Sequence, residues 1–127
     1  MPNKKTAIVV SAHSADFVWR AGGAIALYAE RGWEVTVACL SYGERGESAK
    51  LWREPGMTMA KVKANRKEEA IRAAEILGAQ TLFFDVGDYP IRVPDTFLYE
   101  LAALFRKIRP EFILTHSTKT PTISITR

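Results

Sequence analysis

The sequence predicts an α/β protein with an open, Rossmann-like parallel sheet and helices on both of its faces. Three observations favour this class. Apolar runs of strand length alternate with helical stretches, the connections are long enough for crossover helices, and the strand-like runs are almost continuously apolar, as in strands buried on both faces. About four strands and three helices are expected. A chain of 127 residues with 47% hydrophobic and 25% charged residues suits one globular domain with its own core.

The first strand is expected over residues 5–12, which form a near-continuous apolar run. The following helix should run from Phe17 to about Arg31, with Ser14 or Asp16 as its capping residue. It should end at Gly32, since helices commonly end at glycine.

The middle of the chain predicts a strand, a loop and the longest helix. Residues 33–40 are apolar and β-branched, and the polar loop that follows runs through the breakers Pro55 and Gly56. A helix is expected over residues 59–77, closed by Gly78. Its apolar residues, at helical spacing, are Val62, Ala70, Ala73, Ala74 and Leu77.

The last part of the chain completes the alternation. A third strand is expected over residues 81–85, a helix over about 94–107 and a fourth strand over 111–115, with a turn at 87–90. A strand order of 3-2-1-4 would place the fourth strand beside the first.

Polar residues follow the carboxyl end of each predicted strand. They are His13, residues 41–47, residues 85–88 and His116. Ligands of open α/β sheets bind outside the carboxyl ends of the strands. The sequence therefore predicts a functional site at this edge.

Composition excludes several classes of protein. The longest apolar run is shorter than the roughly 18 residues that cross a bilayer, and the first residues do not resemble a signal peptide, so a cytoplasmic protein is expected. The single cysteine, Cys39, lies in an apolar run and predicts a buried thiol rather than a disulfide or zinc site. The net charge of +4 is scattered, which favours a small anionic substrate over nucleic acid. A homo-oligomer is left open.

The segment after the first strand determines the kind of ligand. A dinucleotide-binding fold would have G-x-G-x-x-G there, whereas this chain has His13-Ser-Ala-Asp16, and Gly22 and Gly23 come too late to hold a phosphate. An imidazole and a carboxylate suit zinc or a similar divalent ion. The alternative is that His13 only ends the strand and Asp16 only caps the helix. Spacing alone leaves both open.

The motif Ala12-His-Ser-Ala-Asp16, followed by Gly22-Gly23, resembles the A-H-P-D-D signature of the LmbE-like, or PIG-L, zinc-dependent deacetylases. Further similarity to this family lies in residues 43–47, 66–78 and 114–117. The resemblance implies a zinc cofactor, with His13 and Asp16 as two of the three protein ligands.

One departure from the family concerns the reaction. In the deacetylases the first aspartate of the signature is the general base, and this chain has Ala15 there. A methyl group cannot take a proton, and loss of a general base typically costs about 100- to 10,000-fold in rate. Residues 13–23, 41–52 and 84–90 look more like the 4-oxalomesaconate hydratase branch. Such enzymes add water to a carbon–carbon double bond of an unsaturated oxo-tricarboxylate in the breakdown of gallate and related aromatic acids.

Hydration of a conjugated double bond needs an electrophile and a base. Zinc on His13 and Asp16 could be the electrophile or supply hydroxide. Glu47 is the first candidate for the base and Glu44 the second, although either could be a solvated loop charge. The basic residues that could pair with substrate carboxylates, or be plain surface charge, are Arg20, Arg45, Lys50 and Arg53.

The second departure lies at the end of the chain. The family's third ligand belongs to a histidine-rich stretch beyond the fourth strand, but residues 118–127 contain no histidine, aspartate or glycine. We therefore expect residues 1–117 to be the amino-terminal part of an LmbE-like domain and 118–127 a non-matching tail of a truncated or frameshifted product. His116 is predicted to face substrate, with a substitute third ligand as the alternative. A hydratase is the leading function, with an N-acetyl-sugar deacetylase or an inactive fragment as alternatives.

Overall fold

The computed structural model describes residues 4–117 and confirms the predicted fold class. Its elements are β1 (Thr6–Ser11), α1 (Asp16–Glu30), β2 (Glu34–Cys39), α2 (Ala49–Trp52), α3 (Met59–Leu77), β3 (Gln80–Phe83), α4 (Asp95–Ile108) and β4 (Phe112–Leu114). The strands form one parallel sheet in the order β3-β2-β1-β4. The predicted strand order is therefore confirmed. The predicted tail, residues 118–127, lies outside the described residues.

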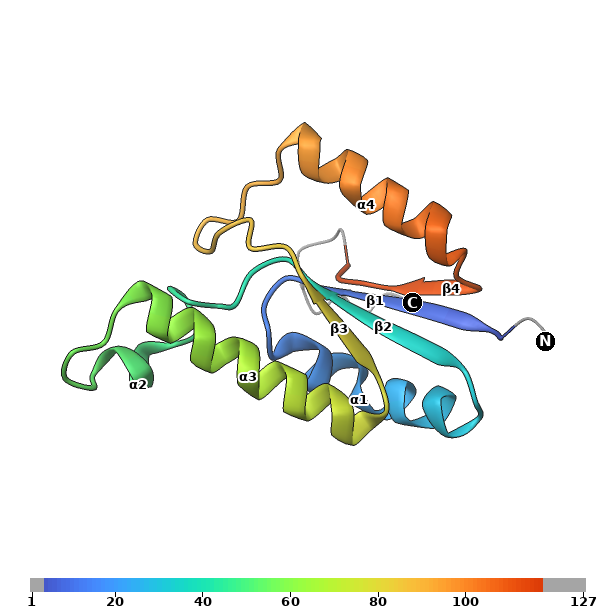
Figure 1. Cartoon of the computed structure of the whole chain (residues 1–127), viewed down its shortest axis with the longest axis horizontal. Coiled ribbons are helices and arrows are strands. Elements are labelled where there is room, and N and C mark those ends of the chain that lie inside the picture. The colour runs from blue at the N-terminus through green and yellow to red at the C-terminus, as the bar shows by residue number, and fades with distance from the viewer. Residues whose placement is uncertain (1–3, 118–127) are drawn as a thin grey trace, which may run out of the picture.

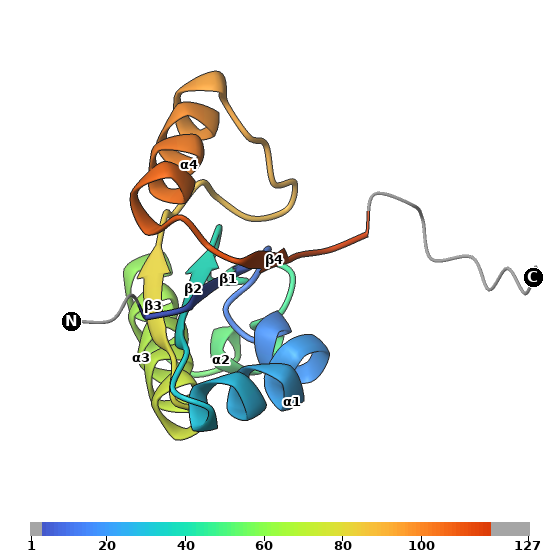
Figure 2. The same cartoon turned by 90° about the vertical axis from the view of Figure 1, so that its right-hand side faces the viewer.

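The sheet lies between two layers of helices. Helices α1 and α3 cover one face and α4 lies over the other, as the two perpendicular views show (Figure 1, Figure 2). The central strands β1 and β2 are the most buried, with Ile8 and Val37 fully inaccessible. The main core cluster lies where α1 and α3 meet these strands, and its buried residues are Val9, Phe17, Ile25, Val35, Val37, Cys39, Ala70 and Ala74.

The long helix α3 has the predicted bounds. The Thr58 side chain accepts a hydrogen bond from the Lys61 backbone N–H at the start, and Gly78 ends the helix with φ of 88°. A Cβ at Gly78 would lie 2.8 Å from the Cβ of Ala29 in α1. Glycine is needed there both for the left-handed backbone and for the close approach of the two helices.

Two local predictions were wrong. The loop after β2 contains the short helix α2, and the N-cap of α1 is Ala15, which makes no side-chain capping bond. The two predicted caps have other partners, because Ser14 Oγ donates to the carbonyl of Tyr42, while Asp16 accepts from the backbone N–H of His13. Ser14 thus connects two loops and Asp16 holds the segment between β1 and α1, and neither caps the helix.

The predicted buried thiol is confirmed, since Cys39 is fully inaccessible and burial raises its pKa to about 12. Within residues 4–117, no helix is both long enough and apolar enough to cross a membrane.

The loops at the carboxyl ends of the strands gather at one edge of the sheet, at the left of Figure 1. They follow β1, β2 and β3. These loops carry the residues of the candidate site.

Candidate metal centre

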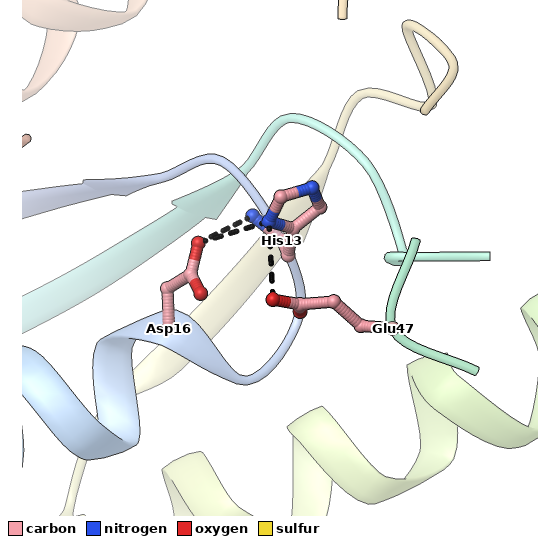
Figure 3. Close-up of side chains that lie close together, drawn as sticks. All are labelled: His13, Asp16 and Glu47. Carbon is pink, nitrogen blue, oxygen red and sulfur yellow. Dashed lines mark hydrogen bonds and ion pairs between the residues drawn. The ribbon is translucent and has the colours of Figure 1, made fainter. Parts of the chain in front are cut away.

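His13 and Asp16 lie together, as predicted, where β1 gives way to α1. His13 Nδ1 is 3.2 Å from Asp16 Oδ2, and the same oxygen accepts a hydrogen bond of 3.1 Å from the His13 backbone N–H (Figure 3). The pair is therefore held by both backbone and side chain.

Glu47, the predicted base, is the third member of this cluster. Its Oε2 lies 3.7 Å from His13 Nδ1, and one ligand atom from each of His13, Asp16 and Glu47 lies within 4.8 Å of the others (Figure 3). The loop reaches this position through Gly43, which has φ of 66° and lies so close to Glu47 that a Cβ would be 3.2 Å from Glu47 Oε1. One nitrogen and two carboxylate oxygens are donors that zinc and similar divalent ions accept. The residues present therefore fit a divalent metal.

Asp88 is a member of the site that the sequence did not identify. Its side chain is 0% exposed, its Oδ1 lies 2.9 Å from His13 Nε2, and its Oδ2 accepts backbone N–H groups from Arg45 at 2.9 Å and Gly46 at 2.7 Å. The segment 85–88 was placed at the correct edge of the sheet. The signal that could have found Asp88 is an acidic residue in the loop after the third strand, at the edge of the sheet where the other polar loops lie.

The carboxylates around His13 raise the pKa of its imidazole. The hydrogen bond with Asp16 raises the pKa of His13 to about 9 against the opposing effect of burial, with smaller contributions from Glu47 and Asp88. Burial would raise the pKa of Asp16, but the hydrogen bond and charge of His13 outweigh it, so the pKa is lowered. Burial of Asp88 is likewise outweighed by the backbone N–H groups of Gly46 and Arg45, which lower its pKa. Without metal, the centre is an imidazolium surrounded by carboxylates.

The metal-free chain should lose stability as the pH rises from about 6.5 to about 9. The unfolded chain releases the His13 proton near the ordinary pKa of 6.5, whereas the folded chain holds it to about 9, so this stabilisation is complete below 6.5 and lost above 9. Urea unfolding at several pH values in a chelator measures the slope. The variant His13→Gln should show a flatter profile, and equal slopes in both proteins would contradict the prediction.

Glu44, the second candidate base, does not belong to the cluster of His13, Asp16 and Glu47. It is buried, and its Oε1 accepts a hydrogen bond of 3.0 Å from the Tyr42 backbone N–H. Its carbonyl accepts a further bond of 2.7 Å from the indole of Trp52. The structure does not bring Glu44 into the three-residue cluster, and its contacts hold the loop together.

The predicted substrate-binding residues separate into two groups. A pocket of about 140 Å³ at the edge of the sheet is lined by Asp16, Arg20 and His116, among others. Arg20 therefore lies beside the candidate centre. The remaining basic residues are exposed and do not line this pocket; they are Arg45, Lys50 and Arg53.

His116 lies next to the centre but outside the metal-donor set. Its Nε2 accepts a hydrogen bond of 3.0 Å from the Ala12 backbone N–H and is 3.6 Å from Asp16 Oδ2. Because this bond occupies the Nε2 lone pair, that nitrogen is not free to bind a metal in this arrangement. His116 lines the pocket described above, and its substrate-facing role stays a prediction.

The chain is similar in sequence to known proteins. Residues 8–122 match the PIG-L family, described as GlcNAc-PI de-N-acetylase. The chain is 64% identical over 118 residues to a 4-oxalmesaconate hydratase of Pseudomonas putida KT2440, covering 93% of this chain and 46% of the relative. The chain thus spans about half the length of this curated relative.

Solved structures of related proteins have a similar fold. The crystal structure of GalB, the 4-carboxy-2-hydroxymuconate hydratase of Pseudomonas putida KT2440, has a TM-score of 0.89 and 65% identity, covering 92% of this chain and 49% of that one. The N,N'-diacetylchitobiose deacetylase of Pyrococcus horikoshii shares the fold, with a TM-score of 0.82 and 21% identity over 96% of this chain and 44% of its own. The fold, the His13–Asp16 motif and the match over residues 8–122 lead to one conclusion: the chain belongs to the PIG-L family.

Proposed function

We propose that this protein is a metal-dependent hydratase that adds water to 4-oxalomesaconate in the catabolism of aromatic acids such as gallate. The observation that carries the proposal is the 64% identity to a 4-oxalmesaconate hydratase, which covers 93% of the chain, the part that contains the candidate centre. The cluster of His13, Asp16 and Glu47 supports it, because hydration needs both an electrophile and a base.

We assign His13 and Asp16 as ligands of a divalent metal, with zinc as the proposed ion. When bound, such an ion would stabilise the negative charge that develops on the carbonyl oxygen of the substrate. Glu47 Oε2 lies 3.7 Å from His13 Nδ1, and the Glu47 side chain is 40% exposed, so its carboxylate can reach a water molecule beside the metal ligands. Glu47 is therefore the proposed acceptor of the water proton.

A small substrate with several carboxylates suits the adjoining pocket. Arg20 and His116 both line this pocket, and Arg20 provides a guanidinium. Arginine binds carboxylates with two parallel hydrogen bonds, which would orient the substrate beside the metal ligands. We further propose that the protein acts in the cytoplasm and does not bind nucleic acid.

Deacetylation, the activity of the wider family, is the second candidate, and Ala15 argues against it. Asp16 interacts with His13, and the preceding residue offers only a methyl group, so the usual base of that reaction has no counterpart here.

The proposal is tested with the purified chain and 4-oxalomesaconate. Hydration removes a conjugated double bond, so turnover is followed as loss of ultraviolet absorbance. We expect turnover that a chelator abolishes and zinc restores, and no acetate from N-acetylglucosamine. Turnover that survives the chelator would refute the metal role, and acetate release would favour the deacetylase. A zinc-loaded chain without turnover would contradict the hydratase assignment for this chain.

A further inference from the structure

We propose that Asp88 is a positioning residue that fixes the ring orientation and the tautomer of His13, so that Nδ1 is the nitrogen offered to a metal. The inference rests on the proposed metal centre. It goes beyond that proposal because Asp88 is not one of the three metal-donor residues, which are His13, Asp16 and Glu47.

The two nitrogens of His13 face different partners. Nδ1 lies 3.2 Å from Asp16 Oδ2 and 3.7 Å from Glu47 Oε2, whereas Nε2 lies 2.9 Å from Asp88 Oδ1. An ionised carboxylate only accepts hydrogen bonds, so in the imidazolium form Nδ1 donates to Asp16 and Nε2 donates to Asp88. When the ring gives up one proton, the shorter bond to the fully buried Asp88 keeps the proton on Nε2. Nδ1 then has the lone pair, which faces Asp16 and Glu47.

Asp88 can impose this arrangement because it is itself immobilised. Its Oδ2 accepts the backbone N–H groups of Arg45 and Gly46, and its side chain is fully buried. Rotating the carboxylate would break both of these hydrogen bonds, which opposes its movement. The position of Oδ1 is thus fixed by the loop that also carries Glu47.

The substitution Asp88→Asn should change the tautomer of His13 while it preserves the shape of the site. Asparagine can keep its Oδ1 on the two backbone N–H groups, and its amide nitrogen then faces His13 Nε2 as a donor. His13 Nε2 must now accept, so the proton of the neutral ring moves to Nδ1, the nitrogen required by the metal. Loss of such an outer partner typically lowers metal affinity by about 10- to 100-fold.

The matched control is Asp85→Asn. Asp85 lies in the same loop and loses the same charge, but its side chain is 48% exposed and pairs with Lys63 at 2.9 Å. Zinc affinity is measured by competition with a chromogenic chelator for the wild type and both variants. We expect the loss only in Asp88→Asn, and equal affinities in wild type and Asp88→Asn would overturn the proposal.

A second measurement is independent of metal and of activity. Nitrogen-15 NMR of the metal-free chain, at a pH where His13 is neutral, reports which ring nitrogen carries the proton. We expect Nε2–H in the wild type and Nδ1–H in Asp88→Asn. A proton on Nδ1 in the wild type would overturn the inference even if the variant failed to fold. If the wild type shows Nε2–H but binds no zinc, the proposed metal centre fails while the role of Asp88 in fixing the ring remains.

Discussion

Replacing Glu47 by glutamine is expected to lower the hydration rate by about 100- to 10,000-fold, the usual cost of losing a general base. Glutamine has nearly the same shape but cannot accept the proton of the attacking water. Steady-state kinetics on 4-oxalomesaconate measure the loss, which should fall mainly on kcat because Glu47 is not assigned to substrate binding.

The control for this substitution is Glu44→Gln. Glutamine at position 44 can still accept the Tyr42 N–H, so its activity should stay near that of the wild type. Zinc affinity then distinguishes two roles for Glu47. A base leaves affinity largely intact in Glu47→Gln, whereas a third ligand lowers affinity and activity together. A fully active Glu47→Gln enzyme would show that the base lies elsewhere.

Replacing Phe17 by alanine is expected to lower the free energy of unfolding by about 3–5 kcal/mol. The Phe17 ring is 1% exposed and belongs to the main core cluster between α1 and the sheet. Alanine would leave a cavity there that the surrounding strands can fill only in part. Urea unfolding of the metal-free chain measures the loss.

The neighbouring variant Val18→Ala provides the comparison. Val18 is 40% exposed, so its truncation should change stability by no more than about 0.5 kcal/mol. Phe17 also follows Asp16 directly in the first turn of α1, so Phe17→Ala should weaken zinc binding as well as stability. Similar unfolding free energies for the two variants would mean that the contact of α1 with the sheet contributes little to stability.

The regular elements could be predicted because their patterns are local. The buried strands β1 and β2 are continuous apolar runs, and α3 shows apolar residues at helical spacing with Gly78 at its end. Helix α2 was missed because its residues, Ala49–Trp52, form a single turn without a buried side, which is too short for a periodic pattern.

The candidate site could be predicted only in part. His13 and Asp16 were found because they are three residues apart and resemble a known motif. From the sequence, Glu47 could be ranked before Glu44 but not separated from it, because both are acidic residues of one loop. The structure separates them, since Glu44 bonds to the Tyr42 backbone and Glu47 lies near His13. Asp88 was missed because its partners lie 42, 43 and 75 residues away along the chain.

The long separation in sequence between His13 and Asp88 affects when the centre can form during folding. His13 and Asp16 can meet within a single turn of chain, but Asp88 reaches His13 only after a loop of 75 residues has closed. Closing that loop costs chain entropy, which the pairing of β1, β2 and β3 must first offset. We therefore expect the complete centre to form late in folding, so that a metal that requires it binds only chains whose sheet has already formed.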